Sequence, residues 1–354
     1  MRTILSIAAI LMALSLPLFG KPDTPYDPDT VVAYDHILSP LQQDIVDELY
    51  ESLSAYDYSI TFSKAVREAD LDAAIEHILT DYPELFHVDL SYQYWYKEDG
   101  WIESVDFQSL MGKRQARKYQ KDLFDVAYSL VSQLPEDADD FYKEVLLHDT
   151  LCAYIDYSLE DELDYTAVGA LLYGRAACEG YAEAFALLLR LAGIPCSAVG
   201  GIGGTGDDTE PHAWNIVSID GDYALVDVTW DDGDEYISHG WFNITSEEMA
   251  RDHIPDAIYE SLPQADSPQL SGFAVMGLEV PGAVDDVELA KWLIDTSLAE
   301  EGPIEVRFSD AAEYEDFSCR FGEIAEECAA KYGLDVALTW YGEPVQQVFT
   351  LEAS

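Results

Sequence analysis

The stretch GRAACEGYAEAFALLLRLAGIPC, residues 174–196, predicts a helix that begins at a cysteine. Its apolar residues recur at helical spacing from Cys178 onward, and Gly193 followed by Pro195 predicts the end of the helix. Gly174 lies just upstream, so the chain enters from a turn that places Cys178 in the first helical turn. The amides and the dipole at that end of a helix lower a thiol pKa and can bind an oxyanion. Cys178 is therefore either a nucleophile or an inert core cysteine.

A second stretch, PHAWNIVSIDGDYALVDVTWDD over residues 211–232, predicts a β-hairpin. Two alternating apolar strands flank Asp220 and Gly221, a dipeptide typical of two-residue turns. With that turn, His212 and Asp227 share one face as diagonal neighbours, about 7–8 Å apart at the backbone. A carboxylate beside a histidine holds one tautomer and orients the ring as a base. The alternatives are a three-residue loop, which would reverse the parity, and two residues that are merely solvated.

Two tryptophans, Trp214 and Trp230, lie near His212 and Asp227 in the predicted hairpin. Trp214 faces Asp227 across the ribbon, and His212 faces Thr229. Trp214 could wall the site and exclude water, although an aromatic residue on a strand is more often core, and Trp230 has the same two interpretations.

These segments resemble the transglutaminase-like superfamily, whose core has a cysteine that opens a helix, then histidine and aspartate on successive strands. The matching pieces are CEGYAEAFALLLRLAGIP, HAWNIV and VDVTWDD, with further matches at YPELF (residues 82–86), YIDYS and WFNITSEEMARDH. The core resemblance covers roughly residues 139–253. It implies that Cys178 is the nucleophile, His212 its general base and acid, and Asp227 the orienting residue, with no metal or organic cofactor.

The resemblance also implies an α+β fold: a papain-type core with a helix-borne cysteine and a β-hairpin that carries histidine and aspartate, flanked by smaller α/β segments. The expected reaction is acyl transfer on a peptide or protein amide through an acyl-enzyme, which water hydrolyses or an amine cross-links. We favour hydrolysis, because water is the default acceptor for an exported enzyme. The backbone N–H of Cys178 is the expected oxyanion donor. The alternative is a catalytically silent envelope or adhesion module that binds peptides or glycans.

The sequence as a whole predicts five segments. Residues 1–20 have the apolar run of a signal peptide, which is short for a membrane anchor, so a secreted or cell-envelope protein is expected. The further segments are a proline-rich linker (21–36), an N-terminal α/β region (37–135), the transglutaminase-like core (136–255) and a small C-terminal α/β domain (268–354).

Periodicity predicts individual elements in these segments. Helices are expected at 40–53, 71–80, 113–134, 139–157 and 284–299, and in a segment ending at Lys331. Strands are expected at LFHVDLSYQYWY and WIESVDFQSL, which form a hairpin, and at PIEVRF, DVALTW and QQVFTL.

Composition narrows the class of partner. Acidic residues number 69 against 18 basic ones, a formal charge of −51. Proteins that bind polyanions need a basic surface, so nucleic acid and anionic membranes are not expected partners. The expected partner is a peptide or protein substrate.

The run GGIGGTG, residues 200–206, contains the spacing G-x-G-x-x-G. A dinucleotide fingerprint must open a helix, whereas this run leads into an acidic, strand-like segment, so phosphate binding is not expected. A mobile loop beside His212 is the favoured interpretation, and a plain flexible connector is the alternative.

Metal-like spacings occur twice. His148 and Cys152 are four residues apart on a helix, but no second ligand pair stands out, and zinc is not expected. The acidic residues of the turn at 231–235 do not have EF-hand spacing and predict a solvated run.

The cysteines and one basic run complete the picture. Cys152 and Cys196 could pair in an exported protein, whereas Cys319 and Cys328 are too far apart on one straight helix. Five basic residues between 113 and 121 predict a solvated helix face, or a surface that docks acidic groups.

Overall fold

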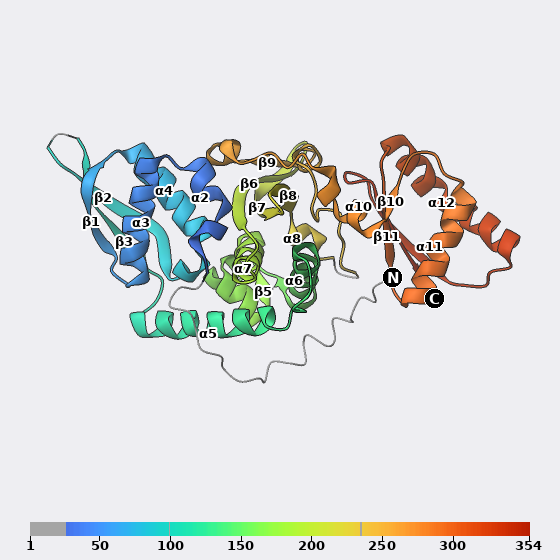
Figure 1. The fold of residues 1–354 in the computed structure, drawn as a ribbon, viewed down its shortest axis with the longest axis horizontal. Coiled ribbons are helices and arrows are strands. Elements are labelled where there is room, and N and C mark those ends of the chain that lie inside the picture. The colour runs from blue at the N-terminus through green and yellow to red at the C-terminus, as the bar shows by residue number, and fades with distance from the viewer. Residues whose placement is uncertain (1–25, 99, 234–235) are drawn as a thin grey trace.

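The structure is a computed structural model that describes residues 26–98, 100–233 and 236–354. Three units follow one another along the long axis of the molecule (Figure 1): an N-terminal α/β unit, a core unit and a C-terminal α/β unit. The signal peptide predicted for residues 1–20 and the first part of the predicted linker lie outside the described residues.

The N-terminal unit is a three-stranded antiparallel sheet with two helices packed against it. Its elements are α3 (Pro40–Ser54), β1 (Ser59–Val66), α4 (Glu68–Asp81), β2 (Val88–Tyr96) and β3 (Ile102–Ser109), in strand order β1-β3-β2. The helix α3 begins where Ser39 and Gln42 form a reciprocal capping box, with Pro40 at the first helical position. The predicted helices and the β2–β3 hairpin are confirmed, whereas β1 was not predicted.

Residues 26–37 are folded, which corrects the linker predicted for 21–36. They form the 3-10 helix η1 (Pro28–Thr30) and α2 (Val32–Ile37). Tyr26 and Val31 are buried, and the backbone N–H of Ala33 donates to Ser197 Oγ at 2.8 Å. The prolines and aspartates of this segment led to the linker prediction, but its apolar residues pack onto the core unit.

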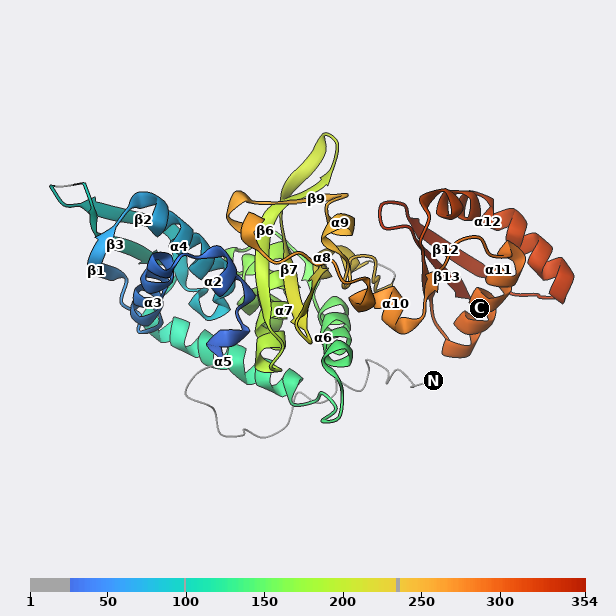
Figure 2. The same ribbon diagram turned by 45° about the horizontal axis from the view of Figure 1, so that its top comes forward.

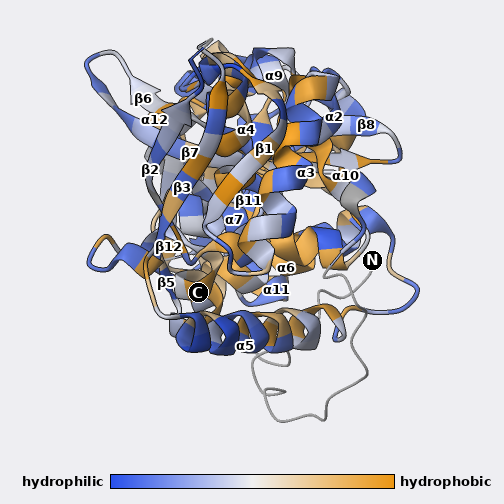
Figure 3. Cartoon of the chain, turned by 90° about the vertical axis from the view of Figure 1, so that its left-hand side faces the viewer, coloured by the Kyte–Doolittle hydropathy of each residue, from blue (hydrophilic) through white to orange (hydrophobic). Residues whose placement is uncertain are grey.

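The helix α5 (Lys113–Val131) passes beneath both the N-terminal unit and the core unit (Figure 1). Its inner face buries Ala116, Leu123 and Ala127, while hydrophilic residues cover much of its outer surface (Figure 3). The basic run lies on that surface, and its Lys118 pairs with Asp122 one helical turn away. These contacts fit the predicted solvated face.

The core unit is a four-stranded antiparallel sheet, in the order β8-β7-β6-β9, packed against a central buried helix. Its main elements are α6 (Asp140–Tyr154), α7 (Cys178–Leu191), β6 (Cys196–Thr205), β7 (Asp208–Ile219), β8 (Asp222–Val226), α8 (Val228–Asp231), α9 (Ser246–Met249) and β9 (His253–Pro255). Smaller elements are β4 (Asp156–Tyr157), η3 (Glu162–Tyr165), the π-helical turn Gly169–Tyr173, β5 (Arg175–Ala176), η5 (Ala257–Ser261) and η6 (Pro268–Leu270).

The β7–β8 hairpin has the predicted two-residue turn. Asp220 and Gly221 take φ values of 55° and 89°, and Ile219 pairs with Asp222. The predicted pairing of His212 with Thr229 is wrong, because β8 ends at Val226 and the chain turns into α8.

The glycine-rich run is not a loop. It lies in β6, which pairs with β7 along its whole length and with β9 on its other edge. The far end of the β6–β7 hairpin projects from the core unit (Figure 2). The prediction of a mobile loop or flexible connector is therefore wrong for residues 200–205: all of them pair with β7, and residues 201–203 also pair with β9.

The acidic turn also differs from its prediction. Asp231 is fully buried, and its Oδ1 accepts from the backbone N–H of Trp241 at 3.0 Å. Asp232 accepts from the hydroxyl of Tyr181. Asp231 is therefore part of the core and Asp232 is half-buried beside it, so neither belongs to a solvated run, while residues 234–235 lie outside the described residues.

A buried ion pair fixes α7 to the N-terminal unit. The guanidinium of Arg190 donates to both the backbone oxygen and the carboxylate of Asp81, at the end of α4. It also donates to the backbone oxygen of Cys196 at 2.8 Å, and the same carboxylate accepts from the N–H of Ala198 at 3.0 Å. One charge pair therefore joins α4, α7 and β6.

The C-terminal unit is a four-stranded sheet in the order β10-β11-β13-β12, packed against two helices. Its elements are β10 (Glu279–Val280), α11 (Asp286–Glu300), β11 (Ile304–Phe308), α12 (Ala311–Tyr332), β12 (Leu338–Glu343) and β13 (Val348–Ala353), preceded by α10 (Gly272–Met276). All the elements predicted here are present, with β12 and β13 displaced toward the C-terminus, whereas β10 was not predicted.

All five cysteines are free thiols, so Cys152 and Cys196 do not form the disulfide considered from sequence. Within the described residues, no helix combines the length and apolar character that crossing a membrane requires.

Candidate active site

Cys178 is the first residue of α7, as predicted. Gly174 takes a left-handed conformation with φ 65°, and the short strand β5 then leads into the helix. The Cys178 side chain is 5% exposed and packs against Ala182, Ala198 and Ala213. Because Ala213 directly follows His212 in β7, the thiol lies beside the backbone of the predicted base.

The thiol does not have the low pKa expected at a helix N-terminus. Burial, the negative charge of Glu179 and a hydrogen bond to Glu179 raise the pKa of Cys178 well above its usual range, against a lowering by the Ala213 backbone. The Sγ donates to Glu179 Oε2 at 3.0 Å. The carboxylate and the apolar surroundings outweigh the helix dipole, so the thiol is held neutral.

His212 and Asp227 are in direct contact, as their predicted placement on one face required. His212 Nε2 lies 2.7 Å from Asp227 Oδ2, and both side chains are buried. Burial alone would raise the pKa of Asp227, but His212 and His253 hold it well below its usual range. With Nε2 occupied by an ionised carboxylate, Nδ1 is the ring nitrogen that can exchange a proton with a thiol.

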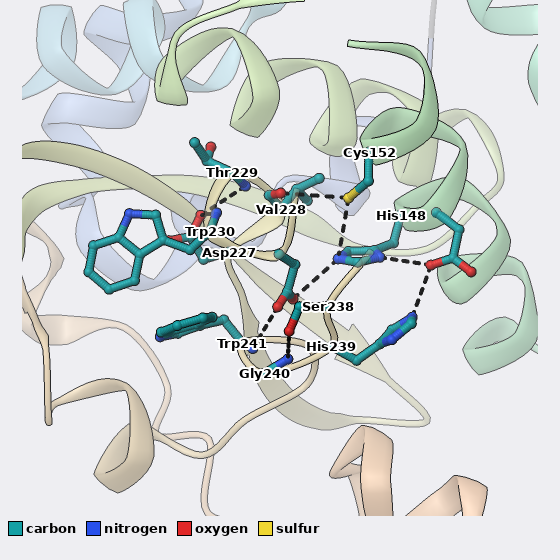
Figure 4. A network of polar contacts seen from close by, with 12 residues as sticks. His148, Cys152, Asp227, Val228, Thr229, Trp230, Ser238, His239, Gly240 and Trp241 are labelled. Carbon is teal, nitrogen blue, oxygen red and sulfur yellow. Dashed lines mark hydrogen bonds and ion pairs between the residues drawn. The ribbon is translucent and has the colours of Figure 1, made fainter. Parts of the chain in front are cut away.

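The second oxygen of Asp227 caps α8. Asp227 Oδ1 accepts from the backbone N–H groups of Thr229 at 3.0 Å and Trp230 at 3.2 Å (Figure 4). The same carboxylate caps α8 and contacts His212, so the position of the helix fixes the position of the His212 ring.

Sequence reasoning missed His253. Its Nε2 lies 3.1 Å from Asp227 Oδ2, the oxygen that His212 also contacts, and its Nδ1 lies 2.6 Å from Asp252 Oδ1. Burial lowers the pKa of His253, but these carboxylates outweigh burial and raise it to about 9. The available signal was the run WFNITSEEMARDH, which ends on this residue.

Both predicted tryptophans pack around these histidines. The Trp230 ring centroid lies 5.0 Å from that of His212 and 4.3 Å from that of His253. Trp214 is 2% exposed and lies 6.3 Å from His212 and 4.9 Å from His253. Trp214 is therefore a core residue behind the imidazoles, and Trp230 covers them more closely.

The glycines of β6 make room for these rings. A Cβ on Gly203 would lie 2.9 Å from Trp230 Cζ2 and 3.1 Å from His212 Cδ2. A Cβ on Gly201 would lie 2.6 Å from Trp214 Cη2. The G-x-G spacing here admits aromatic side chains from neighbouring elements rather than a phosphate.

One part of the chain matches a known protein family. Residues 128–228 match the model of the Transglutaminase-like superfamily. Over 118 residues the chain is 32% identical to the Kyphoscoliosis peptidase of Mus musculus and to that of Homo sapiens; the match covers 29% of this chain but only 18% of either relative.

A crystal structure of a TGase aligns with 64% of this chain and 59% of its own length, with 12% identity and a TM-score of 0.30. The region that matches the family model contains Cys178, His212 and Asp227. In this region the chain is similar to the Transglutaminase-like superfamily.

Proposed function

We propose that the protein is a cysteine-dependent acyl-transfer enzyme that acts on peptide or protein amides. Cys178 is the nucleophile, His212 the general base and acid, and Asp227 the residue that orients His212. The observation that supports this most directly is the 2.7 Å contact of His212 Nε2 with Asp227 Oδ2, next to a backbone that packs against Cys178.

The proposed reaction has two halves. His212 Nδ1 removes the proton from Sγ, and the thiolate attacks the amide carbon, with the Cys178 N–H facing the developing oxyanion. The C–N bond then breaks, and His212 returns the proton to the leaving amine. A water molecule, deprotonated by His212, attacks the thioester, and the breaking C–S bond restores the thiol and releases a carboxylic acid.

The proposal requires the thiol to leave Glu179. In the structure Sγ donates to Glu179 rather than to His212, so substrate binding must turn the thiol toward the imidazole. Asp227 needs no such movement, because two backbone donors and two histidines already surround it. The proposed base is thus already oriented by its carboxylate, whereas the thiol must still break its hydrogen bond to Glu179.

Hydrolysis is proposed ahead of amine cross-linking, because water is present at far higher concentration than any amine outside the cell. A secreted or cell-envelope location is part of this proposal, and it rests on the apolar run in residues 1–20.

The state of the thiol favours a second candidate function, a catalytically silent module that binds peptides or glycans. Cys178 is 5% exposed and its thiol donates to Glu179, and a buried, neutral cysteine is unreactive.

The pH dependence of Cys178 alkylation, followed by peptide mass spectrometry, separates the two functions. Wild type and His212→Ala are compared with peptide substrate analogue absent and present, and the exposed Cys319 serves as internal reference. An enzyme should show Cys178 reacting well below pH 8.5 when the analogue is bound, and losing that reactivity without His212, about 8.5 being the pKa of a free thiol. Cys178 that stays inert, or titrates identically in both proteins, contradicts the enzyme and supports the binding module.

A further inference from the structure

A second buried polar cluster lies at the other end of α8 from Asp227 (Figure 4). Within it, His148 Nδ1 lies 3.0 Å from Asp149 Oδ1, and His239 Nε2 lies 3.0 Å from the same oxygen. The three ligand atoms are all within 4.8 Å of one another. We propose that His148, Asp149 and His239 form a zinc-binding site.

The outer nitrogen of each histidine also has a carboxylate partner. His148 Nε2 lies 3.3 Å from Asp231 Oδ2, and His239 Nδ1 lies 2.8 Å from Glu305 Oε2. Metal-binding histidines characteristically donate their second ring N–H to a carboxylate, which fixes the tautomer and turns the other nitrogen toward the metal. Both rings here have that arrangement around one shared point.

The charge of the cluster favours a divalent cation. Asp149, Asp231 and Glu305 surround the two rings, and their side chains are only 15%, 0% and 8% exposed. Burial lowers the pKa of both histidines, but their acidic neighbours raise it above the usual range, so without a metal the rings bind protons that balance this charge. Glu305 Oε1 is also buried and accepts no hydrogen bond from the described residues. A divalent cation between the ligand atoms would replace these two protons and balance the same charge.

The ligand set and its exposure are those of a zinc site with an open position. Two imidazole nitrogens and one carboxylate oxygen are ligands that zinc prefers. His148 is fully buried, but His239 and Asp149 are 16% and 15% exposed, which leaves one side for a water ligand and for the ion to enter.

Cys152 is not part of the proposed site. Its Sγ lies 4.0 Å from His148 Nε2, the nitrogen that faces Asp231 and not Asp149. From the sequence only His148 and Cys152 were considered as ligands. His239 lies far from them in the sequence, and only the fold brings it next to the helix.

The proposed ion would join two units. His148 and Asp149 belong to α6 of the core, His239 lies in the segment before Trp241, and Glu305 belongs to β11 of the C-terminal unit. Zinc bound here would hold the C-terminal unit against the core and would fix the C-terminal end of α8.

The test measures Zn²⁺ binding by calorimetric titration of the full chain carrying Cys178→Ala, which removes the proposed nucleophile as a competing ligand. After chelation and removal of the chelator, we expect one zinc per chain. In that background, His239→Ala or Asp149→Asn should raise Kd by roughly 100-fold or more, and Glu305→Gln by about 10–100-fold.

Two control variants keep the test specific. Cys152→Ala removes the thiol next to His148, and His253→Ala disrupts the other group of clustered histidines and aspartate. Both should keep the zinc affinity of the background protein. Absence of zinc binding, or an affinity unchanged by both His239→Ala and Asp149→Asn, overturns the proposal.

Circular dichroism of the metal-free variants checks that each one is folded. If a ligand variant does not fold, its titration is replaced by the visible spectrum of Co²⁺ bound to the background protein. Intense bands of a low-coordinate Co²⁺ site without a thiolate charge-transfer band support the proposal. A spectrum equal to that of aqueous Co²⁺ contradicts it.

Discussion

Glu179 controls the proposed nucleophile through its charge. Because this carboxylate follows Cys178 directly and accepts its thiol proton, it raises the thiol pKa beyond what burial alone produces. We predict that Glu179→Gln lowers the pKa of Cys178 and speeds its alkylation at neutral pH by about tenfold for each unit of pKa. The measurement is the alkylation rate of Cys178 against pH, with Glu162→Gln, an exposed glutamate, as control. An unchanged pH profile would show that burial alone holds the thiol neutral.

His253 links pH to stability at the same site. Its folded-state pKa of about 9 lies above the unfolded value of 6.5, so its contribution is complete below pH 6.5 and is lost as the pH rises through 9. We predict that His253→Gln destabilises the protein near pH 6, by about 1.4 kcal/mol for each unit of pKa shift, and much less at a pH above 9. Denaturant unfolding at both pH values measures the difference, and the exposed His36→Gln is the control. An equal destabilisation at both pH values would rule out this role.

At the scale of elements, the glycines of β6 leave room for the aromatic rings of the site because they have no side chains. We predict that Gly203→Ala displaces Trp230 or His212, because its Cβ would lie 2.9 Å from one ring and 3.1 Å from the other. The expected loss of unfolding free energy is about 1–3 kcal/mol, with a loss of Cys178 reactivity. Gly200→Ala is a matched control on the same strand, since its nearest neighbour is an ordinary 3.6 Å contact with Tyr259. Equal thermal midpoints for the two variants would contradict the prediction.

Elements with local signals could be predicted from the sequence. The helix α7 has its own periodicity, a glycine turn before it and a glycine stop after it, and the β7–β8 turn is an Asp-Gly dipeptide with positive φ at both residues. That turn alone places His212 and Asp227 on one face. The resemblance to a known family then supplied the order of the proposed site residues.

Contacts between distant segments could not be predicted in this way. His253 reaches Asp227 because β9 pairs with β6, and that pairing leaves no periodic pattern in a three-residue strand. β1 was not predicted because Lys64 interrupts the inward face of the strand: it is exposed, whereas the other three inward positions are buried. The low thiol pKa predicted from the helix dipole is wrong for two reasons: burial against Ala198 and Ala213 is not visible in the sequence, and the effect of the adjacent Glu179 was not considered.

At the scale of the whole molecule, the C-terminal unit reaches toward the site. Gln346 Nε2 lies 3.2 Å from Asp252 Oδ2, and the other oxygen of Asp252 contacts His253, which contacts Asp227. Arg307 of β11 donates to the backbone oxygen of Gly240 in the core. The C-terminal unit is therefore bonded to the segments that hold the proposed base in place.

We predict that Arg307→Met weakens this junction, because it removes a buried charge-assisted hydrogen bond and a 3.5 Å ion pair with Glu248. The expected loss is about 2 kcal/mol of unfolding free energy, with faster proteolytic cleavage between the core and C-terminal units. Arg320→Met, which removes an exposed pair with Asp316 inside the C-terminal unit, should change neither measurement. Cleavage rates that are the same in both variants would contradict the prediction.

The ion pair of Asp81 with Arg190 has a consequence for synthesis. The two residues are 109 positions apart, so a ribosome completes α4 well before the guanidinium that neutralises its last carboxylate emerges. Until then Asp81 must stay hydrated, because an unpaired buried charge strongly destabilises a fold. We therefore expect the N-terminal unit to mature only after α7 has been translated, so that chains truncated before Arg190 are cut readily by proteases and chains extended beyond β8 are resistant.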